Sequence, residues 1–173
     1  MIRNASKAGI ALLALTSLVF VSCGAPVARG QKTDLTDVKT EITYFDAKAE
    51  MKVNSVTLDF YPENGKVLSD PKKEGNQFVR VDLTFKNTGT EEFAMNYTNV
   101  TLDTSSEAGV SQTFLINDSN ATDLLGTKDM AAGETVTGAM YFEVPAKETA
   151  STLKVSYKGY DSESKEYKAA LSK

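Results

Sequence analysis

The chain of 173 residues contains no histidine. Histidine is the general base of Ser-His-Asp and Cys-His catalysis, so both mechanisms are excluded in their usual forms. Zinc, copper and haem sites built on imidazole are excluded too, because one cysteine cannot replace the missing ligands. Carboxylate pairs remain as acid–base groups, but none lies in an obviously apolar stretch of the sequence. The sequence therefore predicts a protein that is not an enzyme and needs no cofactor.

Cysteine and tryptophan are also scarce. Cys23 is the only cysteine, so no disulfide can form within the chain. An exported domain without disulfides must be held together by its hydrophobic core alone. The chain has no tryptophan, which removes the commonest stacking platform for sugars.

Positive charge is in short supply as well. Lysine and arginine number 19 against 23 aspartates and glutamates, a net charge of −4. Loss of a leader that contains Arg3 and Lys7 would make the net charge −6. This balance argues against a nucleic-acid partner and against docking on anionic lipid headgroups through protein charge.

The first 22 residues have the pattern of a secretory signal peptide. Arg3 and Lys7 carry its only charges, and residues 10–21 form an apolar core of 12 residues. A helix needs roughly 20 apolar residues to cross a bilayer, so this run is too short for a membrane span. A charged start followed by a short apolar core is typical of a secretory signal. We predict that residues 1–22 are cleaved from the mature protein.

The end of this leader resembles the lipobox of bacterial lipoproteins. It reads Val19, Phe20, Val21, Ser22 and Cys23, with Phe20 in place of the usual leucine. In lipoproteins with this motif the thiol receives a diacylglyceryl group, and the signal is cut before the cysteine. The resemblance implies cleavage between Ser22 and Cys23, acylation (palmitate) of Cys23, and anchoring of the chain to the outer side of the cell membrane. An ordinary secretory signal with a soluble product is the alternative.

Residues 23–40 are predicted to be the lipidated N-terminus and a flexible linker. Glycine, proline, alanine, lysine, aspartate and threonine are mixed there without sustained periodicity. The folded domain is expected over residues 41–173, which is enough chain for one domain with a substantial core.

The domain has the alternation of β-strands, most clearly in residues 78–86. The apolar side chains of this strand share one face: Val79, Val81, Leu83 and Phe85. The side chains between them are polar and point away: Arg80, Asp82, Thr84 and Lys86. A turn is expected at residues 87–89, with Gly89 free to take a positive φ.

Further strands are predicted at residues 50–60, 135–145 and 153–157, with weaker ones at 92–96, 100–104, 110–115 and 165–171. Residues 165–171 could return as a hairpin on the strand before them. Seven to eight short strands separated by turns are the pattern of an all-β, antiparallel, immunoglobulin-like sandwich.

The strand at residues 50–60 changes phase along its length. Met51 and Val53 share one phase, whereas Val56, Leu58 and Phe60 share the opposite one. Both sets can face the core only if one extra residue is inserted between them. We therefore predict a β-bulge near residues 54–55.

Three blocks of the sequence resemble a known family. They are residues 76–89 (NQFVRVDLTFKNTG), 130–145 (MAAGETVTGAMYFEVP) and 153–159 (LKVSYKG), and the resemblance spans roughly residues 50–159. They are similar to the telokin-like, immunoglobulin-like domain of unknown function of secreted proteins and lipoproteins in Gram-positive bacteria. Ala132 stands where proline often precedes the glycine. The family has no agreed catalytic residues, so the resemblance implies a fold and a location but no chemistry.

The densest cluster of oxygen ligands lies in residues 117–129. A calcium site there would use Asp118, Asp123 and Asp129, since calcium takes six to eight oxygen ligands. The spacing matches no known calcium loop, and aspartate, asparagine and serine are common in turns. We therefore favour a solvated loop and expect no metal site. In the same region, Leu124, Leu125 and Met130 are expected to cover the open end of the sandwich, the alternative being a small binding patch.

These features favour a non-enzymatic lipoprotein that acts by protein–protein interaction in the cell envelope. The first alternative is an ion- or small-ligand-binding lipoprotein that uses the loop at residues 117–129. The second is an envelope hydrolase that uses carboxylates, or an inhibitor of one.

Overall fold

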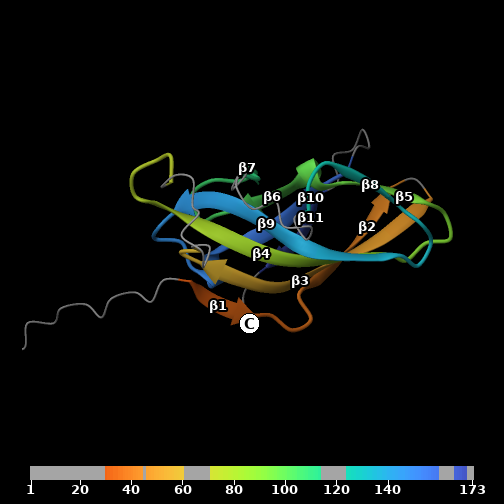
Figure 1. Cartoon of the computed structure of the whole chain (residues 1–173), viewed down its shortest axis with the longest axis horizontal. Coiled ribbons are helices and arrows are strands. Elements are labelled where there is room, and N and C mark those ends of the chain that lie inside the picture. Colours follow the sequence, from red (N-terminus) through yellow and green to blue (C-terminus); the bar gives the residue numbers. More distant parts are fainter. Residues whose placement is uncertain (1–29, 45, 61–70, 114–123, 160–165, 171–173) are drawn as a thin grey trace, which may run out of the picture.

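The computed structural model describes residues 30–44, 46–60, 71–113, 124–159 and 166–170, and these ranges are all-β (Figure 1). The side chains of Tyr44 and of residues 166–170 are not among the described atoms. The predicted leader, Ser22 and Cys23 lie outside these ranges, so their processing stays a prediction. Within the described ranges, no helix is long and apolar enough to cross a membrane.

The larger sheet has five antiparallel strands. Its order is β1 (Gln31–Asp34), β3 (Ala47–Leu58), β4 (Asn76–Asn87) and β9 (Thr135–Pro145). The fifth strand, β2 (Lys39–Tyr44), pairs with the first half of β3, while β1 pairs with its second half. The predicted strands at residues 78–86 and 135–145 are thus neighbours, paired along eleven residues.

The second sheet lies in another layer (Figure 1). Its order is β11 (Glu166–Ala170), β10 (Lys154–Lys158), β6 (Val100–Asp103) and β7 (Val110–Ser111). A separate pair joins β5 (Phe93–Asn96) to β8 (Thr127–Met130), and two short 3-10 helices occupy Tyr97–Asn99 and Ala150–Thr152. The hairpin predicted for the last strand is confirmed, because β11 pairs antiparallel with β10.

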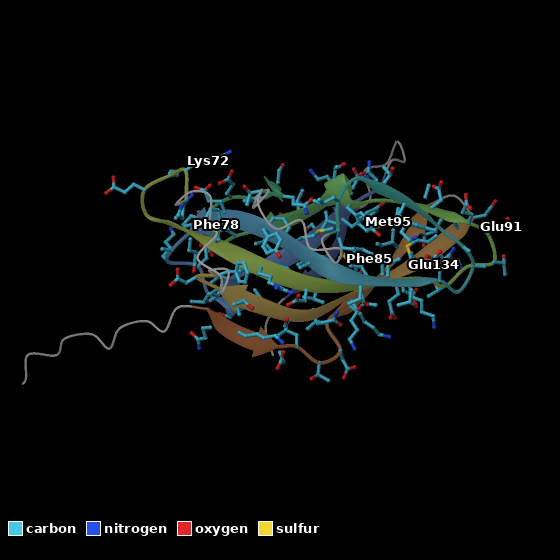
Figure 2. The ribbon with its side chains drawn as sticks, viewed as in Figure 1. Lys72, Phe78, Phe85, Glu91, Met95 and Glu134 are labelled. Carbon is cyan, nitrogen blue, oxygen red and sulfur yellow. The ribbon has the colours of Figure 1, made fainter. Side chains whose placement is uncertain are left out.

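The core lies between the sheets and follows the predicted alternation. Phe85 of β4 and Met95 of β5 are completely buried there, whereas Glu91 is at the surface (Figure 2). The apolar face predicted for β4 is buried in full, as are these inward residues of β9 and β10: Met140, Phe142, Val144, Val155 and Tyr157. Val136, at the start of β9, is only partly buried against the core. The antiparallel sandwich is therefore confirmed.

The bulge in β3 is confirmed. Val53 lies opposite Leu83 and Ser55 lies opposite Asp82, so Asn54 is the extra residue. Met51 and Val53 on one side of the bulge and Val56 on the other are all completely buried. The inserted residue thus keeps both phases of the strand on the core.

Phe60 does not continue that apolar face, contrary to its predicted phase. Asp59 has a φ of 46°, so β3 ends there and the chain turns. The ring of Phe60 packs against Tyr141, with the ring centroids 5.4 Å apart, and it is not part of the core cluster. A turn residue, which periodicity does not reveal, moves Phe60 to the outer face of the sheet.

The domain begins earlier than predicted. Residues 31–34 and 39–40, assigned from sequence to the flexible linker at residues 23–40, are strand. Leu35 is only 6% exposed in the core, and its N–H donates to the Asn54 carbonyl at 2.8 Å. The N–H of Val53 in turn donates to the Val38 carbonyl at 2.8 Å. A boundary at residue 41 is therefore too late for the start of the folded domain.

Three of the eleven strands in the described ranges were not predicted: β1, β2 and β8. Each has six residues or fewer, so its alternation is too short to stand out from turn sequence. The predicted strand at residues 110–115 is shorter, because β7 ends at Ser111 and residues 114–115 lie outside the described ranges.

The turn at residues 87–89 forms, but Gly89 is not one of the glycines with a positive φ. A Cβ at Gly89 would lie 3.1 Å from the backbone nitrogen of Lys48. Glycine is therefore needed there for close approach rather than for a left-handed backbone.

Two of the three apolar residues expected to cover the open end behave as predicted. Leu124 is 3% exposed and Met130 is completely buried, both within the core cluster. The N–H of Leu124 donates to the Ala139 carbonyl of β9 at 3.0 Å. Leu125 differs from the prediction, because 42% of its surface is exposed. Leu124 and Met130 therefore pack against the sandwich, and Leu125 does not.

Candidate functional site

A hollow among the described residues lies on the outer face of the five-stranded sheet, away from the core. Residues directly opposite each other on paired strands point to the same face, so the strand register places two rows of side chains there. The first row consists of Lys32, Thr57, Arg80 and Tyr141. The second row consists of Asp34, Ser55, Asp82 and Ala139.

We call this hollow the outer-face groove. It has a volume of about 470 Å³. The residues of the two rows that lie on β1, β3 and β4 line it, together with Asn54, Phe60 and Thr137. The bulge of β3 lies in its floor, at the point where Asn54 is inserted between the paired residues.

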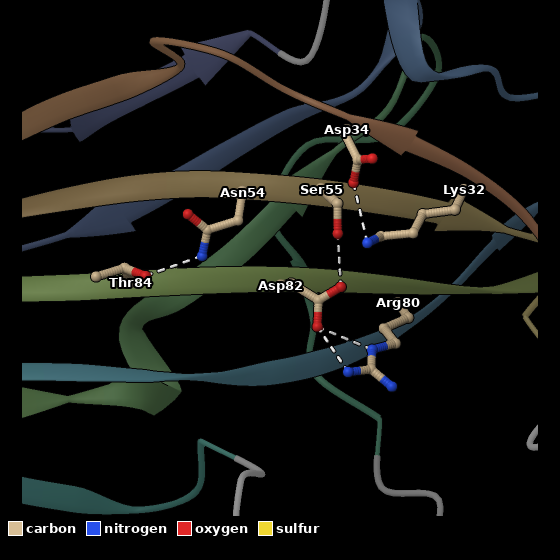
Figure 3. Close-up of polar contacts among 7 residues, drawn as sticks. All are labelled: Lys32, Asp34, Asn54, Ser55, Arg80, Asp82 and Thr84. Carbon is tan, nitrogen blue, oxygen red and sulfur yellow. Dashed lines mark hydrogen bonds and ion pairs between the residues drawn. The ribbon is translucent and has the colours of Figure 1, made fainter.

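An ion pair and a buried hydroxyl lie at the centre of the groove (Figure 3). The Nε and Nη2 atoms of Arg80 donate to one carboxylate oxygen of Asp82 at 2.9 and 2.7 Å. The hydroxyl of Ser55, which is 2% exposed, donates to the other oxygen at 2.6 Å. Both oxygens of Asp82 therefore already accept hydrogen bonds from groups of the protein itself.

The guanidinium of Arg80 is also held by an aromatic ring. Its central carbon lies 5.6 Å from the centroid of the Phe60 ring, within the range of a cation–π contact. Phe60 packs in turn on Tyr141, and the two rings are tilted by 35°. The groove thus has a half-buried aromatic ring beside a fixed planar cation.

A chain of hydrogen-bonded polar side chains crosses three strands beside the groove, and its two ends, Asn54 and Thr137, line the groove. The amide of Asn54 on β3 donates to the Thr84 hydroxyl on β4 at 2.9 Å (Figure 3). Thr84 shares a hydrogen bond of 2.9 Å with Thr137 on β9. At the opposite edge, Lys32 and Asp34 of β1 form an exposed ion pair of 2.9 Å.

A smaller hollow of about 170 Å³ lies beside the end of β9, and its polar groups serve the fold. The Gln77 side chain donates to the carbonyls of Pro145, Ala146 and Glu148 at 3.2 to 3.4 Å. The Glu148 carboxylate accepts hydrogen bonds from the hydroxyls of Ser105 and Thr152. These hydrogen bonds fix the connection between β9 and β10. They leave few polar groups of this hollow available to bind a ligand.

Only one of the three candidate ion ligands, Asp129, lies within the described ranges. Asp129 lies on β8, exposed and opposite Ala94. Asp118 and Asp123 lie outside the described residues, so a calcium site at residues 117–129 is neither supported nor contradicted. Within the described ranges, no group of three or more acidic, cysteine or histidine side chains could hold a metal ion.

Sequence reasoning missed the outer-face groove. The alternation of β4 placed Arg80 and Asp82 outward but gave no reason to pair them with Ser55 or Phe60. Lys32 and Asp34 had been assigned to the linker. The sequence contained one signal for the outer-face groove, which was the polar outward face of the strand next to the predicted bulge.

Comparisons with solved structures show the fold alone. The yjhA protein of Bacillus subtilis superposes with a TM-score of 0.52 at 15% identity, over 74% of this chain and 93% of its own. The Bacillus subtilis protein ycdA, named a "putative lipoprotein", superposes with a TM-score of 0.52 at 18% identity. That match covers 78% of this chain but only 39% of ycdA.

The sequence comparisons give one family and no individual relative. Residues 38–168 match the family described as "Domain of unknown function (DUF4352)". No curated protein matches the chain. The matched range contains the three sequence blocks that suggested a family of unknown function, and it begins within the stretch predicted to be linker.

Proposed function

We propose that this chain, which belongs to the family described as domain of unknown function DUF4352, is a lipid-anchored ligand-binding protein on the outer side of the cell membrane. The observation that carries the binding function is the outer-face groove, a preformed polar hollow with an aromatic ring. Its volume of about 470 Å³ is within the usual range of roughly 300–1,000 Å³ for small-molecule sites.

The proposed location rests on the leader and Cys23. The short apolar core, the small residues before the cysteine and the cysteine itself are all features of lipoprotein signals. The structural neighbour ycdA carries the name of a lipoprotein, which agrees with this location although that likeness extends to the fold only. The relation to telokin-like, immunoglobulin-like domains is likewise part of the proposal.

A small ligand fits the described surface better than a large protein partner does. The centre of a protein–protein interface is typically depleted of charge and enriched in aromatic side chains. Among the described residues, Leu125 is the only large apolar side chain with an exposed surface. The outer-face groove instead presents several polar side chains in a hollow of about 470 Å³, which argues for a small ligand that makes hydrogen bonds.

Binding also fits the groove better than catalysis does. Asp82 is the partly buried carboxylate of the groove, and both its oxygens accept hydrogen bonds from Arg80 and Ser55. A general acid or base must instead reach the proton of a substrate. The chain also has no histidine, the side chain that most often serves as a general acid or base. We therefore propose that the ligand is bound and released without chemical change.

The anchor is tested by labelling cells with palmitate. We expect the wild-type protein to incorporate the label and Cys23→Ala to incorporate none, with the variant retained as precursor or released into the medium. Ser22→Ala, which keeps a small residue before the cysteine, is the matched control and should still be labelled. Equal labelling of the wild type and Cys23→Ala would contradict the anchor.

The binding function is tested on the purified protein in detergent. The probe is the dialysable fraction of a hydrolysate of isolated cell envelopes. A ligand that binds only the folded state raises the melting temperature, by several degrees at about a hundredfold excess over Kd. We expect this rise in the wild type and in Lys154→Ala, on the other sheet, but not in Phe60→Ala. An equal rise in all three proteins, or no rise in any, would contradict binding in the outer-face groove.

A further inference from the structure

We propose that the ligand of the outer-face groove is a neutral saccharide. The inference rests on the proposed binding function and adds the chemical class of the ligand. It depends on three properties of the groove: balanced charge, a supported aromatic ring, and a row of hydroxyl and amide groups.

The charges of the groove are paired within it. Arg80 lies 2.7 Å from Asp82, and Lys32 lies 2.9 Å from Asp34. Among the described lining residues there are therefore two cations and two anions, whose charges balance. An anionic ligand on Arg80 would have to displace Asp82 or lie beside it, and a cation on Asp82 would meet Arg80. An uncharged ligand neither breaks the Arg80–Asp82 ion pair nor places like charges side by side.

The aromatic ring provides an apolar surface for a sugar. The C–H face of a pyranose ring packs on an aromatic ring through many weak dispersion contacts. Phe60 lines the groove and is held by Tyr141 and by the Arg80 guanidinium, so its orientation is fixed before a ligand arrives. It takes the place of the tryptophan that the chain lacks.

The row of hydroxyl and amide groups provides partners for sugar hydroxyls. A hydroxyl both donates and accepts hydrogen bonds, and an amide offers a separate donor and acceptor. Asn54, Thr84 and Thr137 form one connected row of such groups across the sheet. Because β-strands hold these side chains, their spacing is rigid, as a site for a ligand with several hydroxyls requires.

The test is calorimetric titration of the purified protein in detergent with tetrasaccharides. The neutral probes are the tetramers of N-acetylglucosamine, glucose and mannose. The charged probes are the tetramers of glucosamine, which is the cationic counterpart of the first, and of galacturonic acid. We expect at least one neutral tetramer to bind, with an affinity that changes little with salt, and the charged tetramers to bind at least about tenfold more weakly.

Variants connect that binding to the groove. Phe60→Ala should weaken the neutral tetramer at least about tenfold, while Lys154→Ala, on the other sheet, should bind like the wild type. Phe60 lies outside the core cluster, so unchanged circular dichroism is expected to show that Phe60→Ala is folded. Tighter binding of a charged tetramer, or undiminished binding by Phe60→Ala, would overturn the saccharide proposal.

The same experiments separate failure of the ligand class from failure of the function. If no neutral tetramer binds but the envelope fraction still raises the melting temperature through Phe60, the groove binds another class of ligand and the saccharide proposal is wrong. If neither effect is seen, the proposed binding function is wrong as well.

Discussion

Leu83 of β4 and Phe142 of β9 are completely buried between the two layers of the sandwich. Replacing either with alanine removes apolar contacts and leaves a cavity, so we expect each substitution to lower the free energy of unfolding by about 2–5 kcal/mol. Lys154, exposed on β10, should tolerate alanine within about 0.5 kcal/mol. Urea unfolding measures all three, and similar losses for the buried and exposed positions would mean that the faces are wrongly assigned.

Glu148 makes the stability of the protein depend on pH. Its side chain is buried, with 3% exposed, and burial raises the pKa of Glu148. Hydrogen bonds from Ser105 and Thr152 outweigh that effect, and the pKa ends below that of a free glutamate. A carboxylate with a lowered folded-state pKa stabilises the fold above its unfolded-state pKa, and this contribution is lost as the pH falls through the folded-state value.

We therefore expect Glu148→Gln to be less stable than the wild type at neutral pH. The gap in the free energy of unfolding should shrink as the pH falls towards about pH 3. Urea unfolding over this range measures the gap, with the exposed Glu92→Gln as the matched control. A gap that stays constant, or widens in acid, would show that hydrogen bonding to the carboxylate does not stabilise the fold.

Arg80 shows how far a single residue could be predicted. Alternation along β4 correctly placed it on the outer face of the sheet. Its contacts with Asp82 and Phe60 could not be predicted from the sequence. Predicting a contact between two outward side chains requires the conformations of both side chains, which alternation does not provide. The position of Phe60 also depends on the positive φ of Asp59, which the sequence does not mark.

Among the elements, β3 depends most on one residue. Deleting Asn54 would remove the bulge and turn Met51 and Val53, both completely buried, towards the outer face. Each such side chain contributes about 1.5–3 kcal/mol when buried, so we expect the deletion to cost at least about 3 kcal/mol.

Asn54→Ala is the control for that deletion, because it keeps the residue count. It removes the hydrogen bond to Thr84 and should cost about 1 kcal/mol. Urea unfolding compares the two variants with the wild type. A deletion no more costly than the substitution would show that the bulge is not required to keep both halves of β3 on the core.

The long strands were predictable and the shortest ones were not. β3, β4 and β9 have eleven or twelve residues each, so their alternation and the phase slip in β3 are visible in the sequence. β1 has four residues, and none of its side chains is fully buried. Its pairing with β3 creates the strand, and that pairing leaves no periodic trace in the sequence.

At the scale of the whole molecule, the outer-face groove is a product of strand order. The order β1-β3-β4-β9 places outward side chains from four strands on one surface, namely Lys32, Asp34, Ser55, Thr57, Arg80, Asp82 and Thr137. These segments are distant in the sequence, and the pattern of each one alone predicts only a polar face of a strand. Composition and alternation therefore predicted a sandwich but not its binding surface, which depends on which strands become neighbours.

The central claim is that this surface is the binding site, and nuclear magnetic resonance of the isotope-labelled mature protein in detergent tests it most directly. Addition of the dialysable envelope fraction should shift the backbone amide signals of Ser55, Arg80, Asp82 and Thr137. The signals of β6 and β10, on the other sheet, should stay in place. Shifts centred on β6 and β10, or spread evenly over both sheets, would contradict a binding site in the outer-face groove.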